Sequence, residues 1–223
     1  RVAIAGNPNT GKTTLFNELT GARGKIGNYP GVTVERHLAN LELEGHGSVV
    51  LMDVPGTYSL SARSREEQLA IQAVAGLHPL ERPDLVLCVV DSTQLVRNLY
   101  LVLQLIELGI PVVVALSMSD RLESTGQTLD VPALMRELEV PCVPIVAVKG
   151  IGLAELKREM ARVLADPRRG RAVWRWESDD PLLTADVRAV AKELPAEWVA
   201  GDPQRQRALA LWALLSIDET DEL

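Results

Sequence analysis

The sequence predicts an α/β fold in which helices cover both faces of a mostly parallel sheet, followed by a small domain made only of helices. Short β-branched runs alternate with longer segments of helical periodicity up to about residue 165. This alternation is typical of parallel strands joined by helices. Two runs, LVLCVV and VVVAL, are apolar throughout, as expected for central strands that are buried on both faces. The alternation stops after residue 165.

The expected elements follow one another along the chain in a regular order. Strands are expected at residues 1–5, 32–43, 48–54, 84–91, 111–117 and 141–148. Helices are expected at residues 11–20, 64–76, 93–108, 130–139 and 152–165. The first strand, RVAIA, leads into a glycine-rich loop, and the helix after that loop ends at Gly21, since glycine commonly terminates helices.

The C-terminal part of the chain has a different composition. The segment DPRRGRAVWRWESDDP is polar and contains prolines, so it is interpreted as a linker. Two amphipathic helical segments follow at 182–194 and 203–217, before an acidic tail. We therefore expect one domain at residues 1–165 and an all-helical, possibly truncated domain at residues 166–223.

Composition limits the class of protein. The chain has 223 residues, of which 47% are hydrophobic and 24% charged, as in ordinary globular proteins. Its net charge of −7 argues against a nucleic-acid partner, which would need a basic face. No apolar run approaches the ~18 residues of a membrane span. Cys88 and Cys142 lie in apolar runs and are interpreted as buried thiols. Arg1 already lies in a strand pattern, so the chain is expected to be a trimmed fragment.

The strongest motif is GNPNTGKTT, which matches the pattern G-x-x-x-x-G-K-[ST] between an expected strand and an expected helix. Glycines let the backbone wrap a phosphate, while the lysine reaches the outer phosphates and the first threonine offers a hydroxyl to Mg²⁺. The residues expected around the phosphates are Asn7, Asn9, Thr10, Gly11, Lys12, Thr13 and Thr14. Because the motif is in the right context, a plain glycine-rich turn is a weak alternative.

A second motif, DVPG, follows the strand SVVLM directly. Asp53 at the end of that strand can hold Mg²⁺ through water, and Gly56 can give a backbone N–H to the terminal phosphate. D-x-x-G alone is common. Its place after a strand, downstream of a phosphate loop, is what makes it specific.

The segment GNYPGVTVE lies between the first helix and the second strand and is expected to be a loop. Gly31 and Thr33 are candidate nucleotide contacts, with Thr33 as a second Mg²⁺ ligand that orders the loop when the terminal phosphate is present. The alternative is a plain connection in which Thr33 begins the strand.

The tetrad Ser117-Met118-Ser119-Asp120 follows the strand VVVAL, at the sheet edge where a base would lie. The Asp120 carboxylate can accept from the ring N–H and amine of guanine. The backbone N–H groups of Ala147 and Val148, after the last strand, could reach the guanine oxygen. Phosphate loop, Thr loop, D-x-x-G, base-reading Asp and final loop stand in the order of the translation-factor class of P-loop GTPases. A P-loop GTPase fold is therefore predicted.

The stretches GNPNTGKTTLFNELTG, GNYPGVTVE and DVPGTYSLSARSREE closely resemble the N-terminal G domain of FeoB-type ferrous iron transporters, and the helical segment after them resembles that family's GDP-dissociation-inhibitor-like domain. The resemblance implies a GTP- and GDP-binding module on the cytoplasmic face of the bacterial cell membrane. It also implies a partner within the same protein, a transmembrane iron-permease domain, and allows a homo-oligomer of the full protein.

The sequence differs from the family pattern at two positions: Ser117 replaces an Asn, and Ala147 replaces a frequent Ser. Both changes predict weaker guanine binding and rapid release of the nucleotide, while Asp120 still distinguishes guanine from adenine. Thr57 stands where many switch GTPases have a catalytic Gln, so hydrolysis is expected to be slow. Asn9 is the residue that in similar cation-activated GTPases helps to hold K⁺, which would supply the charge of an arginine finger. The catalytic assignments are Asn9, Lys12, Thr33 and Gly56.

Two further functions compete with this interpretation. A soluble GTPase of RNA modification or ribosome assembly, of the TrmE-Era type, shares the NPN-x-GK style of loop, but the acidic charge counts against it. A nucleotide sensor with little turnover would keep the same binding residues and lose only the hydrolysis.

Overall fold

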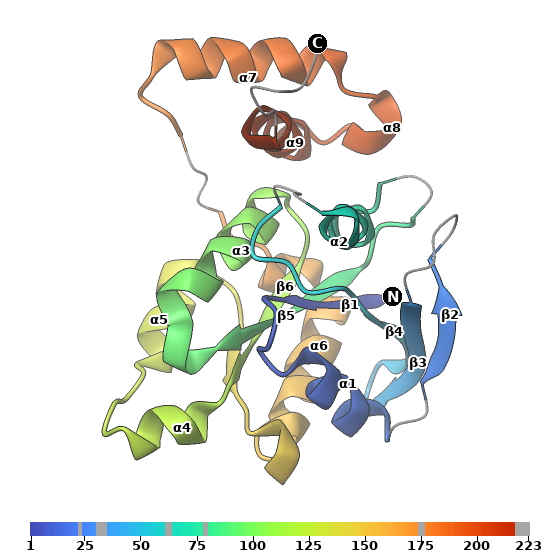
Figure 1. Cartoon of the computed structure of the whole chain (residues 1–223), viewed down its shortest axis with the longest axis vertical. Coiled ribbons are helices and arrows are strands. Elements are labelled where there is room, and N and C mark those ends of the chain that lie inside the picture. Colours follow the sequence, from blue (N-terminus) through green and yellow to red (C-terminus); the bar gives the residue numbers. More distant parts are fainter. Residues whose placement is uncertain (22–23, 30–34, 61–63, 78–79, 174–176, 217–223) are drawn as a thin grey trace.

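The computed structural model describes residues 1–21, 24–29, 35–60, 64–77, 80–173 and 177–216. These residues form the predicted α/β fold, with a twisted sheet between two layers of helices and a further helical layer beyond one of them (Figure 1). The strands are β1 Val2–Gly6, β2 Lys25–Asn28, β3 Glu35–Leu43, β4 Gly47–Asp53, β5 Leu85–Asp91, β6 Val112–Ser117 and β7 Cys142–Pro144.

Strand order in the sheet is β2-β3-β4-β1-β5-β6-β7. The strands β4, β1, β5, β6 and β7 are parallel to one another, whereas β3 is antiparallel to β4 and β2 is antiparallel to β3. In the register, Gly6 lies opposite Val89, and Asp91 lies opposite Ser117. The residues that leave β1, β4, β5 and β6 therefore emerge at one edge of the sheet.

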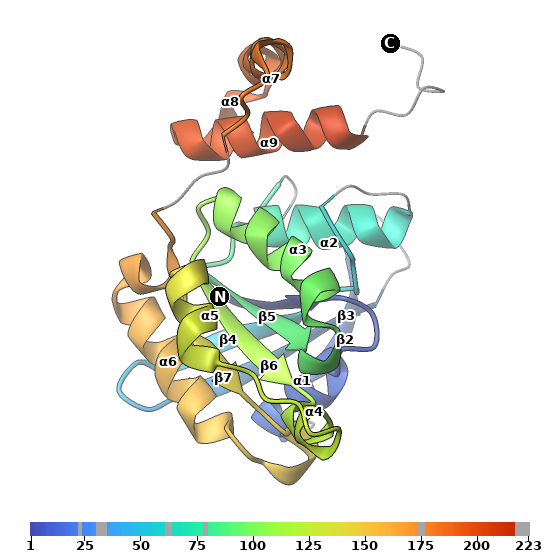
Figure 2. The same ribbon diagram turned by 90° about the vertical axis from the view of Figure 1, so that its left-hand side faces the viewer.

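Side chains of the central strands alternate between two cores. Ala3 and Ala5 belong to one core, and Val2 and Ile4 belong to the other. Helices α2 and α3 cover the first core, and α1 and α6 lie on the opposite face of the sheet (Figure 2). These four residues are at most 1% exposed, which explains why these strands are apolar without alternation. The helices of this part are α1 Lys12–Thr20, α2 Arg65–Ala75, α3 Leu95–Glu107, α4 Ser119–Ser124, α5 Val131–Leu138 and α6 Leu153–Ala165.

Three elements differ from the predictions. The strand β2 is not among the expected strands, and its last two residues, Gly27 and Asn28, belong to the segment expected to be a loop. It pairs with β3 in an antiparallel register that the sequence pattern does not indicate. The last strand, expected at 141–148, ends at Pro144, because the chain turns back so that Val146 N donates to Ile151 O at 3.1 Å. The helix α4 is too short for periodicity to predict it.

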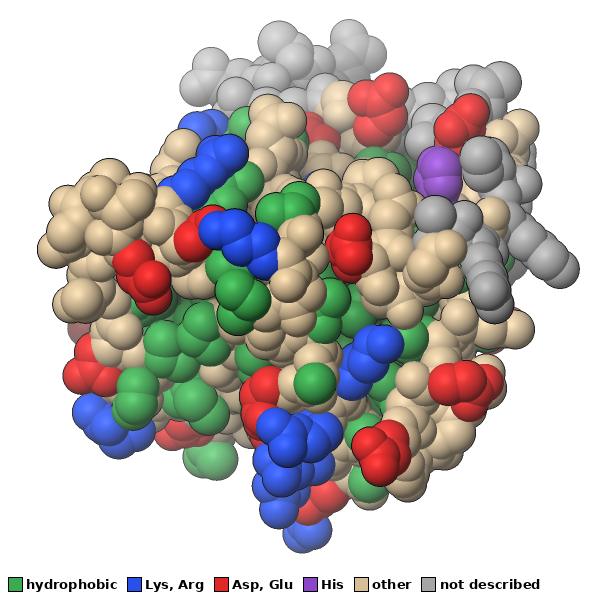
Figure 3. Space-filling model, turned by 90° about the horizontal axis from the view of Figure 1, so that it is seen from below, with side chains coloured by type: hydrophobic (Ala, Val, Ile, Leu, Met, Phe, Trp, Pro, Cys, Tyr) green, Lys and Arg blue, Asp and Glu red, His purple; other side chains and the backbone are tan. Residues whose placement is uncertain are grey.

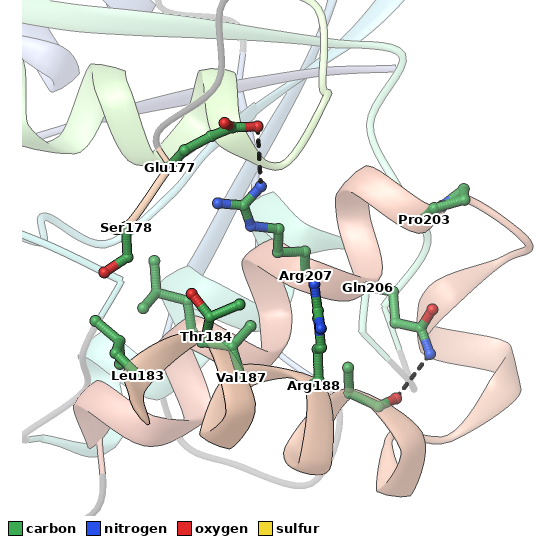
Figure 4. Close-up of a pocket in the computed structure, with 11 residues that line it drawn as sticks. Glu177, Ser178, Leu183, Thr184, Val187, Arg188, Pro203, Gln206 and Arg207 are labelled. Atoms are coloured by element: carbon green, nitrogen blue, oxygen red, sulfur yellow. Dashed lines mark hydrogen bonds and ion pairs between the residues drawn. The ribbon is translucent and has the colours of Figure 1, made fainter. Parts of the chain in front are cut away.

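The chain ends in three helices, α7 Pro181–Glu193, α8 Ala196–Val199 and α9 Pro203–Ser216. They form a layer over α2 and α3, remote from the loops that follow β1 and β6 (Figures 1 and 2). A hollow of about 430 Å³ lies between α7 and α9. Gln206 Nε2 donates to Ala191 O across it at 2.7 Å, and Arg207 lies 3.9 Å from Glu177 at its rim (Figure 4).

In the described part of the chain, no helix has both the length and the apolar composition that crossing a membrane requires.

The helix α9 is attached to the rest of the molecule through two polar side chains. Gln204 Nε2 donates to Ile106 O and Glu107 O, at 3.2 and 3.0 Å, at the end of α3. Arg205 is 2% exposed and donates to Ala75 O at the end of α2 and to Trp198 O. The last carbonyls of a helix lack partners within it. Arg205 therefore satisfies Ala75 O at the end of α2. Gln204 adds a donor at the end of α3, where Ile106 O also accepts from Gly109 N at 2.9 Å.

We expect Arg205→Ala to lower the free energy of unfolding by about 2–4 kcal/mol, because it leaves a cavity and two unpaired carbonyls. Urea unfolding followed by tryptophan fluorescence measures this. The control is Arg188→Ala, which replaces an exposed arginine of α7 and should change the free energy by less than about 0.5 kcal/mol. Equal shifts in the two variants would contradict a structural role for Arg205.

Candidate functional site

The loop between β1 and α1 is shaped by a close approach of its first residue to β5 and by left-handed backbone angles. A Cβ on Gly6 would lie 2.4 Å from Val89 O, so no side chain fits where the loop leaves the sheet. Asn9 and Gly11 have left-handed φ values of 65° and 87°. Alternation of right- and left-handed residues turns successive N–H groups toward one concavity, which suits an anion. Thr10 Oγ1 donates to Asn7 O at 2.9 Å and closes the loop.

Lys12 begins α1 and lies beneath this loop. It is 9% exposed, and its Nζ is 3.3 Å from Asn7 O. Burial lowers the pKa of Lys12, while the nearby Asp53 raises it by a smaller amount. A Cβ on Gly56 would lie 3.1 Å from Lys12 Nζ and from Pro8, so a side chain at this position would crowd both. The structure thus brings the D-x-x-G glycine against the lysine and the loop.

Thr13 and Asp53 lie next to each other. Thr13 Oγ1 donates to Asp53 Oδ2 at 3.3 Å, and Asp53 Oδ1 is buried without a partner among the described residues. Burial raises the pKa of Asp53, and Lys12 lowers it by less. A hydroxyl beside an unpaired carboxylate oxygen is a donor set that fits Mg²⁺.

The D-x-x-G segment runs along the phosphate loop. Val54 N donates to Ile4 O at 3.1 Å, and Thr57 N donates to Gly6 O at 3.2 Å. Beyond them, Leu60 N donates to the buried Gln104 Oε1 of α3 at 2.8 Å. Sequence reasoning missed Gln104, because a contact between residues 44 positions apart leaves no local pattern.

The start of the predicted Thr loop is anchored by a residue that sequence reasoning also missed. Tyr29 is 1% exposed, and its hydroxyl donates to Asp53 O at 3.3 Å. Burial raises the pKa of Tyr29 to about 12. Gly31 and Thr33, predicted as nucleotide and metal contacts, lie outside the described residues.

Ser117 contacts the phosphate loop directly. Its side chain is buried, and Oγ lies 2.8 Å from Thr10 O and 3.1 Å from Val90 O. The sequence alone predicts only that serine here weakens guanine binding. The register that places β6 beside β5 brings the hydroxyl close enough to contact the phosphate loop directly.

The remaining base-site candidates come from two segments that touch. Met118 has a left-handed φ of 56° and precedes α4, whose first turn carries Asp120. Ala147 and Val148 lie in a short 3-10 turn, Ala147–Lys149. Ser119 Oγ donates to Ile145 O at 3.3 Å and ties the two segments together.

Asp120 is partly exposed and carries an ion pair. Lys149 Nζ lies 2.8 Å from Asp120 Oδ2, and Arg121 N donates to Oδ1 at 3.1 Å. The hydrogen bond from Lys149 holds the pKa of Asp120 below its ordinary value. The face of the molecule opposite α7–α9 carries interspersed acidic and basic side chains (Figure 3).

Comparison with known proteins identifies relatives. The family model described as ferrous iron transport protein B matches residues 1–160. The Fe(2+) transport protein A/Fe(2+) transporter FeoB fusion protein of Porphyromonas gingivalis is 52% identical over 156 residues, which are 70% of this chain and 18% of that protein. The chain spans about a fifth of the length of the first curated relatives that it matches.

Solved structures of FeoB cytosolic domains are also similar to this chain. The cytosolic domain of L. pneumophila FeoB has a TM-score of 0.77 and 35% identity, and the match covers 95% of this chain and 78% of that one. The cytosolic domain of the T. maritima FeoB iron transporter in GDP form I has a TM-score of 0.76 and 30% identity, with coverage of 99% and 87%.

The partly buried Asp53 carboxylate should destabilise the fold at neutral pH. Its pKa is raised above the ordinary 3.8, so the folded protein binds this proton more tightly than the unfolded chain does. We expect Asp53→Asn to increase the free energy of unfolding at about pH 7.5. The increase should shrink as the pH falls through the raised pKa toward 3.8, because protonation then neutralises Asp53 in the parent.

Urea unfolding at several pH values checks this expectation. The control is Asp186→Asn, which removes the same charge from an exposed position on α7. A loss of stability in Asp53→Asn that does not depend on pH would show that the carboxylate is not destabilising.

Proposed function

This chain belongs to the ferrous iron transport protein B family, and on that premise we propose that it binds and hydrolyses GTP for an attached membrane domain that takes up Fe²⁺. One observation carries the proposal: the phosphate loop, the D-x-x-G segment and the base tetrad leave β1, β4 and β6 at one edge of the sheet and contact one another there. The GDP form of the T. maritima neighbour supports the guanine nucleotide as ligand.

The phosphates would lie over the concavity of the loop, with its backbone N–H groups and Lys12 toward them. Thr13 and Asp53 would hold Mg²⁺, joined by Thr33, and the ion would neutralise charge on the outer phosphates. The close contact of Gly56 with Lys12 supports a backbone N–H donor from Gly56 at the terminal phosphate. Further contacts assigned to this region are Asn7, Thr10, Gly11, Thr14 and Gly31.

On the base side, the Asp120 carboxylate would accept from the ring N–H and amine of guanine. Ala147 and Val148 would offer backbone N–H groups to the guanine oxygen, and Met118 would line the base. Ser117 would act at a distance from the base, by bracing the phosphate loop through Thr10 O. This direct brace supports retention of the loop geometry, although serine lacks the reach of the family's asparagine.

Hydrolysis would not depend on the side chain after D-x-x-G. Thr57 is 1% exposed, and its hydroxyl donates to Ser59 O at 2.5 Å, so it is not free to orient a water. We assign the orientation of the attacking water to backbone groups. The positive charge that stabilises the transition state would come from K⁺ held by Asn9, which is exposed in the loop and therefore accessible to an ion. The reaction would therefore be slow without K⁺.

The domain organisation is part of the proposal. Residues 1–165 would be the G domain and residues 166–223 a GDP-dissociation-inhibitor-like helical domain at the cytoplasmic face of the bacterial cell membrane. The permease domain of the same protein is the proposed partner, and a homo-oligomer of the full protein is compatible with this organisation. Nucleic acid has no role in it.

A competition series with GTP, ATP and XTP tests the guanine assignment. The parent should prefer GTP to ATP by roughly tenfold or more, since adenine presents a bare nitrogen to the Asp120 carboxylate. Asp120→Asn should shift the preference toward XTP, and Lys12→Ala should abolish binding of all three. Equal affinity for ATP and GTP in the parent would overturn the guanine assignment.

Phosphate release from GTP in KCl and in NaCl tests the cation. We expect faster hydrolysis in K⁺, because the ion adds positive charge where the transition state gains negative charge. Asn9→Ala should lose the difference between the two salts but keep GDP binding. Equal rates of the parent in both salts would rule out the cation, and no turnover in either would favour the sensor.

A further inference from the structure

The carboxylate assigned to guanine already has a cationic partner from the other side of the base site. Lys149 belongs to the turn that carries Ala147 and Val148, whereas Asp120 belongs to α4. Their ion pair, at 2.8 Å between Lys149 Nζ and Asp120 Oδ2, bridges the two segments between which a base edge would enter. Among the described residues, Asp120 is the one carboxylate within 4.0 Å of Lys149.

Guanine needs both oxygens of this carboxylate. Its ring N–H and its exocyclic amine donate in parallel, one to each oxygen. Oδ1 accepts from Arg121 N within the first turn of α4, so it is fixed in place by the helix itself. Oδ2 is the oxygen that Lys149 uses. A neutral N–H donor therefore meets an oxygen whose charge is already compensated by an ammonium group.

We propose that Lys149 competes with the guanine base for Asp120 and thereby lowers both the affinity for guanine nucleotides and the discrimination that Asp120 provides. This inference rests on the proposed function of the same site. Lys149 would be an affinity- and specificity-determining residue that faces the base without being required to hold it.

Exposure of the pair determines how strong this competition can be. The side chains of Lys149 and Asp120 are 57% and 37% exposed. Ion pairs at such exposure are weak, and releasing one should change an affinity by about two- to five-fold. Lys149 can leave without a new buried charge, because its turn is exposed, with Val148 72% accessible. The competition therefore lowers the affinity for the base without preventing the base from binding.

The test compares GDP with IDP, whose base lacks the exocyclic amine and so makes one hydrogen bond to Asp120 where guanine makes two. Both nucleotides carry the same diphosphate, so its contribution cancels in the ratio of their affinities. The ratio therefore reports the contact of the base with Asp120. Equilibrium displacement of a fluorescent GDP analogue gives both affinities on the chain as it stands.

We expect Lys149→Met to tighten GDP and to raise the GDP preference over IDP by about two- to five-fold. Lys149→Arg keeps the ion pair and should behave like the parent. The matched control is Lys192→Met, which removes the same charge from an exposed position on α7 and should leave the ratio unchanged. The difference between Lys149→Met and the parent should shrink at high salt, which screens exposed pairs.

A ratio that stays the same or falls in Lys149→Met overturns the inference, because Lys149 would then be neutral toward the base or would help to hold it. Failure of the parent to bind GDP is a different result. It would overturn the proposed function as well, and the two failures are distinguished by the parent protein alone.

Discussion

The close approach of β1 to β5 at Gly6 is the constraint on which the site depends. A Cβ at this position would lie 2.4 Å from Val89 O, so the loop must leave the sheet through a residue without a side chain. The same approach places Thr10 O within 2.8 Å of Ser117 Oγ, two strands away. The D-x-x-G segment then has a backbone partner, since Thr57 N donates to Gly6 O at 3.2 Å. One glycine thus sets the distance between three loops.

The fold and most of the site candidates could be predicted because their determinants are local. Gly6, Lys12 and Asp53 lie in short motifs next to apolar strands, and parallel strands bring such motifs to one edge. Contacts between distant segments could not be predicted. The direct brace by Ser117 depends on the register of β5 with β6, and the Lys149 ion pair depends on how a turn after β7 faces α4. Neither geometry has a sequence pattern.

The C-terminal helices are joined to the elements that hold the site. The helix α2 follows the D-x-x-G segment, and its last turn is held by Arg205 of α9. Before α2, Leu60 N is held by Gln104 of α3, and the end of α3 is held by Gln204 of α9. A shift of the D-x-x-G segment that carried α2 with it would therefore have to break two hydrogen bonds to buried side chains, one at Leu60 and one at Ala75 in the last turn of α2.

Two carboxylates of the site lie in opposite environments, which suits opposite ligands. Asp53 is partly buried near Lys12, and this burial raises its pKa, so a bound cation would offset an existing cost. Asp120 is partly exposed, and Lys149 lowers its pKa, so its charge is already stabilised before any base arrives. Under the proposed function, a divalent ion at Asp53 would compensate an unpaired buried oxygen, whereas a guanine base at Asp120 would meet a carboxylate that is already paired. The first environment favours tight binding of the ion, and the second favours weaker binding of the base.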